Sequence, residues 1–272
     1  MAVELEIRDG SPYWVSPDIS VLADPFDEEE RGMPEAGTRC YLRARVRNNG
    51  STAVANATVR FYWANPAIGL SRDTANRIGQ AFVSLAPGDV KEVLCLTPWV
   101  PEFLNDGHEC VLAEAFHPTD PITLSTDFEV PTDRHVAQRN LSIAIGSMSG
   151  MFHFNFEMHN ASRKDQAFQA MVQPVPFEKL HKQFPQLTRM HNLEGLKEGK
   201  LVKSAFTDTA CLAPGFKDQG QQSDTLKLQG HGKTKMALTG QIDGDFAAVN
   251  IFQLRDGKML TGGLCVLIIN SK

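Results

Sequence analysis

YLRARVRNNGSTAVANATVRFYW, residues 41–63, consists of two alternating runs joined by Asn, Gly and Ser, which favour turns. In each run an apolar residue follows a polar one, so one side of the extended chain is apolar and the other is polar. Trp63 falls on the apolar side of the second run. The pattern predicts a β-hairpin in a half-buried antiparallel sheet, with Trp63 in the core.

The composition fits a globular protein of one large domain or two ordinary ones. The chain has 272 residues, of which 42% are hydrophobic. Its longest apolar run, Leu264–Ile269, fits a buried strand and is far shorter than a membrane helix. The N-terminus alternates charged and apolar residues and lacks the features of a secretory signal, so the expected location is the cytoplasm, unless export follows a route without such a signal.

The net charge of −5 is unevenly distributed. Residues 1–135 hold 21 Asp and Glu against 11 Lys and Arg, a balance of −10, whereas residues 136–272 hold 11 against 16, a balance of +5. The basic residues of the first part are almost all Arg, and those of the second part are mostly Lys. Both shifts indicate two separate domains.

The chain has five cysteines, Cys40, Cys95, Cys110, Cys211 and Cys265. They form no CxxC or CxxH motif, and four of the five lie in expected strands. Buried free thiols are the simplest interpretation. The alternative is one disulfide between Cys95 and Cys110, in what look like neighbouring strands. The absence of a signal sequence favours free thiols.

About seven short strands separated by turn residues follow one another from Ser16 to Pro131, a spacing typical of a β-sandwich. Four motifs occur in this part: PDISV at 17–21, ARVRNNG at 44–50, LAPGD at 85–89 and VAQRNL at 136–141. Their order resembles the bacterial CARDB-type family of immunoglobulin-like domains over roughly residues 16–141. The resemblance implies adhesion or appended binding rather than chemistry. Insertions around 98–110 depart from the family pattern.

A second unit, which this resemblance does not cover, is expected after a linker at 132–139. Alternating and apolar runs predict further strands. FEKLHKQF, at 177–184, has apolar residues at helical spacing between two prolines and predicts a short helix. The Asp256-Gly257 pair predicts a hairpin turn between the last two strands.

The predicted fold class is therefore all-β. Two tandem immunoglobulin-like β-sandwich domains are expected, an acidic one at 1–131 and a basic one at 140–272. The second domain is expected to carry a helical insertion near 177–200. No exact internal repeat is visible, so duplication is an open alternative.

The expected strand at 152–159 places four polar residues on one face: His153, Asn155, Glu157 and His159. Residues that are six apart in a strand lie roughly 20 Å apart, so His153 and His159 cannot share an ion. Only Glu157 and His159 could do so, together with ligands from another strand. A solvated or inter-domain face is the simpler interpretation.

The segment between the first two expected strands is acidic and includes Asp24, Asp27 and Glu28–Glu30. Its carboxylates could hold calcium, but the alternating spacing of a dedicated calcium loop is missing. Asp24, Asp27, Glu157 and His159 are thus the candidate metal ligands. The expectation remains that the protein uses neither metal nor cofactor.

Candidate residues for binding a partner come from the first domain. Arg43, Arg45, Arg47 and Arg60 form a cationic patch, and Trp99 and His108 lie in a long loop. Nucleic acid could use such a patch, but the acidic domain and the scarcity of exposed aromatic residues argue against it. Pairing of these arginines with neighbouring Glu residues is the simpler alternative.

Enzymatic motifs are missing from the sequence. It contains no Gly-x-Ser-x-Gly elbow, His-Glu-x-x-His helix or phosphate loop. His108 and Cys110 lie too far apart in an extended strand for a direct hydrogen bond. Asn-x-Ser/Thr triplets at Asn49, Asn56, Asn140 and Asn160 are interpreted as turn residues rather than glycan sites.

The predicted function is non-enzymatic binding or assembly with another protein, through the long segments 64–77, 98–108 and 177–222. Self-association of acidic and basic domains is one form of it. The alternative is a carbohydrate-binding or cell-surface-binding accessory module. Exposed tryptophans in a row would favour this alternative, and buried tryptophans would remove its main support.

Overall fold

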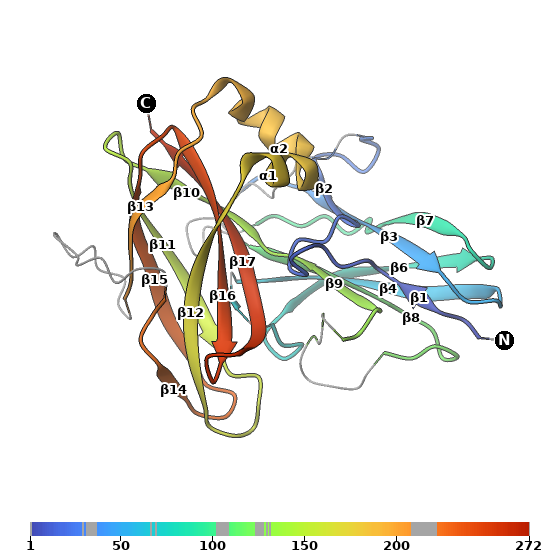
Figure 1. The fold of residues 1–272 in the computed structure, drawn as a ribbon. Coiled ribbons are helices and arrows are strands. Elements are labelled where there is room, and N and C mark those ends of the chain that lie inside the picture. The colour runs from blue at the N-terminus through green and yellow to red at the C-terminus, as the bar shows by residue number, and fades with distance from the viewer. Residues whose placement is uncertain are drawn as a thin grey trace. The chain divides into compact units, whose positions relative to one another are not determined.

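The computed structural model describes residues 2–28, 30, 37–65, 67–68, 70–101, 109–122, 128, 130, 132–207 and 222–271. The chain forms two compact units. Unit 1 comprises residues 1–65 and 71–140, and unit 2 comprises residues 66–70 and 141–272. Strands dominate both units, as the sequence predicts (Figure 1). In the described part of the chain, no helix has the length and apolar character needed to cross a membrane.

Unit 1 is a sandwich of two four-stranded sheets. One sheet contains β1 (Leu5–Glu6), β2 (Ile19–Leu22), β3 (Tyr41–Asn48) and β7 (Val90–Leu94), with β3 in the centre. The other has the order β6 (Asn76–Leu85), β4 (Val54–Ala64), β8 (Cys110–Phe116) and β9 (Val136–Arg139). All strand pairs in this unit are antiparallel. Apolar residues of both sheets share one core.

The expected hairpin at 41–63 is corrected by the structure. Both strands are present, but β3 pairs with β1, β2 and β7, whereas β4 pairs with β6 and β8. The two strands therefore lie in opposite sheets. Their apolar sides, represented by Leu42 and Phe61, meet in the same core. Alternation identified the buried side of each strand correctly, but it carries no information about which strand lies beside it.

The expected linker at 132–139 contains a strand. Residues 136–139 form β9, which pairs with β8 from Val111↔Arg139 to Glu114↔Val136. All four residues of β9 are buried, including Gln138 and Arg139. Ladder hydrogen bonds to β8 satisfy the backbone of this segment, so residues 136–139 belong to the sheet and not to a linker.

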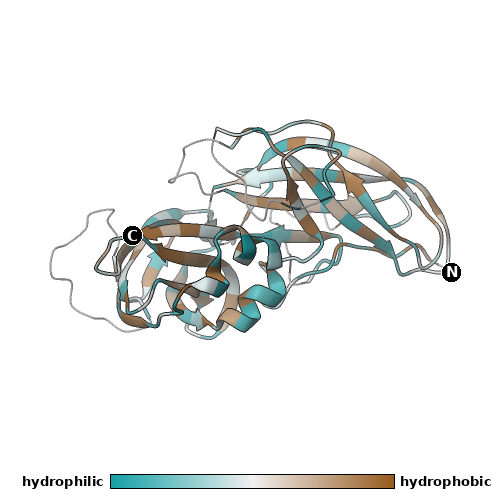
Figure 2. Cartoon of the chain, turned by 90° about the horizontal axis from the view of Figure 1, so that it is seen from above, coloured by the Kyte–Doolittle hydropathy of each residue, from teal (hydrophilic) through white to brown (hydrophobic). Residues whose placement is uncertain are grey.

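Unit 2 is also a sandwich of two sheets. The five-stranded sheet has the order β10 (Leu141–Gly146), β17 (Met259–Asn270), β16 (Phe246–Arg255), β12 (Gln166–Val175) and β14 (Leu226–Leu228). The four-stranded sheet has the order β13 (Leu201–Thr207), β15 (Lys233–Ile242), β11 (Met151–His159) and β5 (Ala67–Ile68). Their facing apolar residues form a second core. Figure 2 shows hydrophobic residues, in brown, along the strands.

The expected helical insertion consists of α1 (Phe177–Gln183), α2 (Pro185–Met190) and a 3-10 turn at Leu193–Gly195. Pro176 precedes α1, and Pro185 is the first residue of α2. Phe177 contacts Phe246 of β16 with ring centroids 5.6 Å apart. The helices thus lie against the five-stranded sheet (Figure 1). Buried residues of this layer are Leu180, Phe184, Leu187 and Leu193.

The two units share one strand arrangement. In unit 1, β3 pairs with β7 in one sheet, while β4 pairs with β6 and β8, and β8 pairs with β9, in the other. In unit 2, β11 pairs with β15, while β12 pairs with β14 and β16, and β16 pairs with β17. All of these pairs are antiparallel. The helices and β13 lie between β12 and β14, the position that corresponds to the connection from β4 to β6 in unit 1.

Candidate functional site

A pocket of about 520 Å³ lies in unit 2, at the end of the five-stranded sheet beside the helical insertion. Its lining comes from four separate segments of the chain: Met148; His191, Asn192 and Leu196; Gly244 and Asp245; and Ile269, Asn270 and Ser271. Pockets of this size commonly hold small ligands or parts of a partner molecule. The pocket is therefore the candidate functional site.

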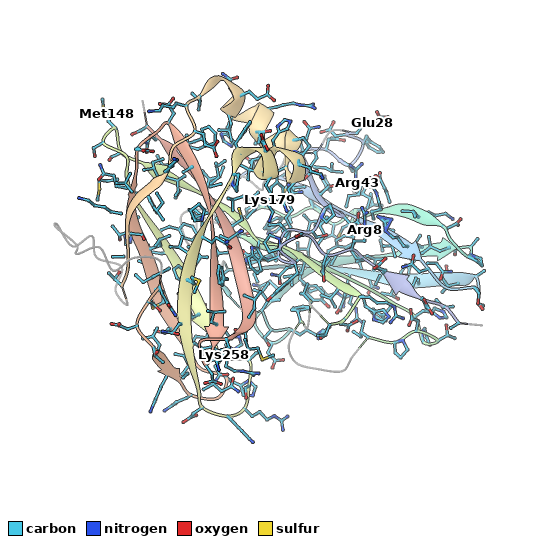
Figure 3. All side chains as sticks on the ribbon, viewed as in Figure 1. Arg8, Glu28, Arg43, Met148, Lys179 and Lys258 are labelled. Atoms are coloured by element: carbon cyan, nitrogen blue, oxygen red, sulfur yellow. The ribbon has the colours of Figure 1, made fainter. Side chains whose placement is uncertain are left out.

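A tight turn between β10 and β11 presents Met148 at the pocket. The Ser147 N–H donates to the Met151 carbonyl oxygen at 2.8 Å, and the Gly150 N–H donates to the Ser147 carbonyl oxygen at 2.9 Å. Gly150 has φ +80°, a conformation that favours glycine. The side chain of Met148 is 83% exposed (Figure 3). The turn thus holds a flexible apolar side chain in solvent.

The end of β17 joins the neighbouring turns into a second wall. The Asn270 side-chain amide donates to the Gly244 carbonyl oxygen at 2.6 Å, and the Asn270 backbone N–H donates to the Asp245 carbonyl oxygen at 2.8 Å. The Ser271 N–H donates to the Gly146 carbonyl oxygen at 2.9 Å. These bonds fix three segments that are distant in the sequence.

The helical insertion supplies the third wall. The His191 N–H donates to the Leu187 carbonyl oxygen at 3.1 Å and ends α2. Asn192 follows in the left-handed conformation, with φ 49°, and redirects the chain toward Leu196. The next residue, Lys197, donates its backbone N–H to the Asp245 carboxylate at 2.8 Å. The insertion is thereby anchored to the turn between β15 and β16.

The lining combines apolar side chains with polar groups that lack partners. Burial lowers the pKa of His191, which favours the neutral imidazole. The His191 Nε2 and Asn270 Oδ1 atoms are shielded from water and have no hydrogen-bond partner among the described residues. Unpaired buried polar atoms cost free energy, on the order of 1–3 kcal/mol each.

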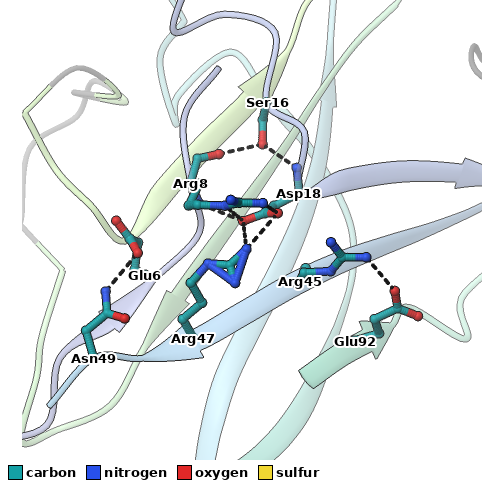
Figure 4. A network of polar contacts seen from close by, with 8 residues as sticks. All are labelled: Glu6, Arg8, Ser16, Asp18, Arg45, Arg47, Asn49 and Glu92. Carbon is teal, nitrogen blue, oxygen red and sulfur yellow. Dashed lines mark hydrogen bonds and ion pairs between the residues drawn. The ribbon is translucent and has the colours of Figure 1, made fainter. Parts of the chain in front are cut away.

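The expected cationic patch of unit 1 is paired within the chain. Glu92 on β7 lies 3.2 Å from an Arg43 nitrogen and 3.0 Å from an Arg45 nitrogen. Arg47 donates to the buried Asp18 carboxylate at 3.1 Å (Figure 4). Three of the four predicted arginines thus bind carboxylates on neighbouring elements.

Arg60, the fourth arginine, belongs to a second cluster. Its guanidinium lies 3.5 Å from the buried Glu114 carboxylate and 4.5 Å from the centre of the Phe116 ring. Tyr62 donates its hydroxyl hydrogen to Glu114 at 2.6 Å, and Arg72 binds the same carboxylate at 3.0 Å. The cluster neutralises a buried charge, a structural role.

The candidate metal ligands do not converge on one point. Asp24 and Asp27 accept hydrogen bonds from backbone N–H groups of their own turn. Glu157 lies 3.7 Å from the ammonium group of Lys233, and His159 is buried. Within the ranges that the structure describes, no group of three or more His, Cys, Asp or Glu side chains is placed to hold a metal ion.

The remaining predicted residues fall in different places. Trp99 is buried and stacks on the half-buried Trp63, with ring centroids 6.4 Å apart. His108 lies outside the described residues. Cys95 and Cys110 are both free thiols, so no disulfide joins them in this structure. His153 contacts Thr239 at 2.9 Å and Asn155 at 3.1 Å through its two ring nitrogens.

The pocket was not predicted from the sequence, although its helical wall falls within the expected contact segment 177–222. Met148 could have been identified from the sequence, because it is an apolar residue within the turn-forming run Ser-Met-Ser-Gly. No local pattern marks His191 or Asn270 as part of a site. Nothing in the sequence connects residues that lie almost 80 positions apart.

No protein family and no curated protein matches this sequence. Among solved structures, the chain is similar to the CARDB domain of a Pyrococcus furiosus protein, solved in complex with di-metal ions. The identity is 16% over 51% of this chain and 85% of that domain, with a TM-score of 0.30.

Parts of two enzymes are also similar to this chain. A β-glucosidase from Erythrobacter marinus is 16% identical over 50% of this chain and 15% of its own, with a TM-score of 0.28. Red sea bream transglutaminase is 9% identical over 93% of this chain and 31% of its own, with a TM-score of 0.25. Strands form most of the described structure, which is an all-β fold with two short helices.

Proposed function

We propose that this protein is a non-enzymatic binding protein whose unit 2 pocket receives an apolar side chain from a partner protein. The observation that carries the proposal is the pocket itself, about 520 Å³ in volume with the exposed Met148 on its lining. Exposed apolar side chains beside a cavity are typical of surfaces that recognise proteins. Methionine suits such surfaces because it adapts to different partners.

The comparison between the two units also supports the pocket of unit 2 as the binding site. The strands described in unit 1 form a sandwich with no helix among the described residues, so the strand framework does not require the helices of unit 2. The insertion of unit 2 provides His191, Asn192 and Leu196 to the pocket. Additions to a shared scaffold are common locations of function.

Binding fits the chemistry of the lining better than catalysis does. Asp245 accepts a hydrogen bond from the Lys197 backbone, and no described hydrogen bond or ion pair links Ser271 or His191 to a carboxylate. Activation of a hydroxyl nucleophile requires such a base. Trp14 and Trp99 are buried, which removes the main support for carbohydrate binding as the alternative.

Selection from a displayed library of random peptides tests the proposal. Wild-type protein should enrich peptides with an aliphatic or aromatic residue at one fixed position. Met148→Glu should abolish enrichment, because it places a charge beside the pocket. Val202→Glu is the matched control, since Val202 is 50% exposed on β13 of the same unit and is not among the pocket-lining residues. Equal loss in both variants, or no enrichment by the wild type, would contradict the proposal.

A further inference from the structure

One strand of unit 1 has a largely unpaired backbone edge. β6 is ten residues long, forms the end of its four-stranded sheet and pairs with β4 on one side. Apart from this ladder, the described hydrogen bonds to its backbone come from two side chains. Asn48 donates to the Leu85 carbonyl oxygen, and the Lys91 ammonium group donates to that of Ser84. An edge of this kind can accept a further strand.

The ladders of this sheet determine which backbone groups of β6 face outward. The Ala115 N–H of β8 donates to the carbonyl oxygen of the residue before β9, at 2.8 Å. Hydrogen bonding alternates along a strand, so Val59 of β4, which lies opposite Ala115, faces β6 and bonds Ala81. The two neighbours of Ala81, Gln80 and Phe82, therefore direct their N–H and carbonyl groups away from β4.

This edge lacks the usual protection against pairing, which is short length, Lys or Pro. Residues 79–85 read Gly-Gln-Ala-Phe-Val-Ser-Leu, and Phe82 is 60% exposed. Two other edges of unit 1 are protected. β7 is five residues long and carries Lys91, and Val15 bridges to Arg139 of β9.

We propose that β6 of one copy pairs antiparallel with β6 of a second copy, about a two-fold axis at Phe82. Phe82 then bonds Phe82, and Gln80 bonds Ser84 of the second copy. The two four-stranded sheets form one sheet of eight strands. A second copy supplies an uncharged strand of the same length with the same unpaired groups. The contact uses no residue of the unit 2 pocket.

The side chains of β6 are self-complementary in this register. The exposed Phe82 ring meets its counterpart across the axis, and aromatic cross-strand pairs stabilise sheets. On the other side, Ala81 lies opposite Val83 of the second copy, and both residues pack in the core of unit 1. The apolar side of the sheet therefore continues across the axis.

The charges near the ends of β6 fit the antiparallel orientation. Arg77, whose described partner is the Gln80 side chain, extends toward the turn that holds Asp89 of the second copy. The Asp89 side chain is 35% exposed and lies 3.4 Å from Lys91. Parallel pairing would instead place the two Arg77 side chains together. A two-fold contact also closes on itself, so neither β6 edge stays open.

Lys91 competes with this pairing. Its ammonium group donates at 2.7 Å to the Ser84 carbonyl oxygen, which is the acceptor for the Gln80 N–H of the second copy. The Lys91 side chain is 51% exposed, so its ammonium group can turn into solvent. Removal of this side chain should therefore strengthen the dimer.

Sedimentation velocity from about 1 to about 200 µM protein tests the inference. Wild-type protein should form a dimer and no larger species. Phe82→Lys should weaken association at least about tenfold, because it places like charges opposite each other at the axis. Phe26→Lys is the matched control, since Phe26 is an exposed aromatic residue of unit 1 outside β6. Lys91→Ala should strengthen association, and thermal unfolding confirms that each variant folds.

Cysteine cross-linking tests the register. In a Cys211→Ser background, oxidised glutathione should link Phe82→Cys into a disulfide dimer, because paired Cα atoms lie about 5.5 Å apart. Ser84→Cys should stay unlinked, since its two Cα atoms would be roughly 14 Å apart. A wild-type monomer at every concentration, equal loss of association in both Lys variants, or equal cross-linking at 82 and 84 overturns the inference.

Discussion

Asn48 in unit 1 and Asn160 in unit 2 hold the same corner of their sandwiches through the same hydrogen bonds. Each side-chain amide donates to the carbonyl oxygen four residues later, at 2.8 Å in both cases. Each side-chain oxygen accepts the N–H two residues later, at 3.1 Å for Asn48 and 3.0 Å for Asn160. Both residues are buried.

The same two side chains also bind the turn opposite. Asn48 donates to the carbonyl oxygens of Leu85 and Ala86, and Asn160 donates to those of Leu228 and Gln229. These acceptors end β6 and β14, which occupy equivalent positions. One polar residue thus connects both sheets in each unit. The shared corner and strand order favour duplication of one sandwich as the origin of both units.

Replacement of either asparagine should destabilise its own unit. Asn48→Ala and Asn160→Ala each leave buried carbonyl and N–H groups without partners, so we expect a loss of about 3 kcal/mol in the free energy of unfolding. Asn49→Ala is the control, because the Asn49 side chain makes an exposed hydrogen bond to Glu6 (Figure 4). Denaturant unfolding measures the change. Similar stability of all three variants would refute the role of the corner.

Asp18 should contribute more to stability than Glu92. Its buried carboxylate accepts two hydrogen bonds from the Arg8 guanidinium, at 3.0 and 2.8 Å, and also binds Arg47 (Figure 4). Asp18→Ala leaves Arg47, which is largely buried, without its partner and should cost roughly 3–5 kcal/mol. Glu92→Ala should cost less than about 1 kcal/mol, because its ion pairs are exposed. Equal shifts of the urea midpoint for Asp18→Ala and Glu92→Ala would contradict this prediction.

Asp9 should make stability depend on pH. Burial, followed by the charge of Glu6, raises the pKa of Asp9 from 3.8 to about 7. The folded state therefore holds the proton more tightly than the unfolded chain. This stabilisation is fully present below about pH 4 and is lost as the pH rises through about 7.

Asp9→Asn keeps a neutral side chain at every pH. The variant should melt at a higher temperature than the wild type at about pH 8, and the difference should narrow toward about pH 5. Asp27→Asn controls for the loss of one surface carboxylate. A pH-independent difference between Asp9→Asn and the wild type would show that Asp9 is ionised in the folded state throughout.

The described thiols should be unreactive in the folded protein. Burial raises the pKa of Cys95 and Cys110, and it raises the pKa of Cys265 to about 12, while Cys40 is also buried. Thiolate is the reactive form. In a Cys211→Ser variant, a disulfide reagent at about pH 8 should therefore label the protein only after denaturant is added. Rapid labelling of the native variant would contradict this expectation.

Local patterns in the sequence were sufficient where neighbouring residues determine the structure. The Asp256-Gly257 turn adopts positive φ at both residues, and β16 and β17 pair on either side of it as expected. The helix after Pro176 also begins and ends where prolines allow it. In both cases the information lies within a few residues.

Local patterns were insufficient where pairing depends on distant segments. The arginines on β3 looked like an open cationic surface, yet their carboxylates come from Asp18 and from Glu92, on a strand about 45 residues away. Tyr62, on the opposite side of β4 from Phe61, is also buried, because its ring contacts Phe128 with centroids 5.3 Å apart and its hydroxyl donates to Glu114. Trp63 is half-buried on the core side of β4, where it stacks on Trp99.

Residue patterns were enough to predict an all-β chain, the apolar sides of its strands, and a short helix that begins after Pro176. These properties follow from periodicity and from the conformations that Pro, Gly and Asn allow. Tertiary structure alone decided that β3 and β4 lie in opposite sheets and that four separate segments enclose the pocket. The reason is physical, since burial of an apolar side requires a partner surface, and several surfaces in the chain are apolar enough to serve.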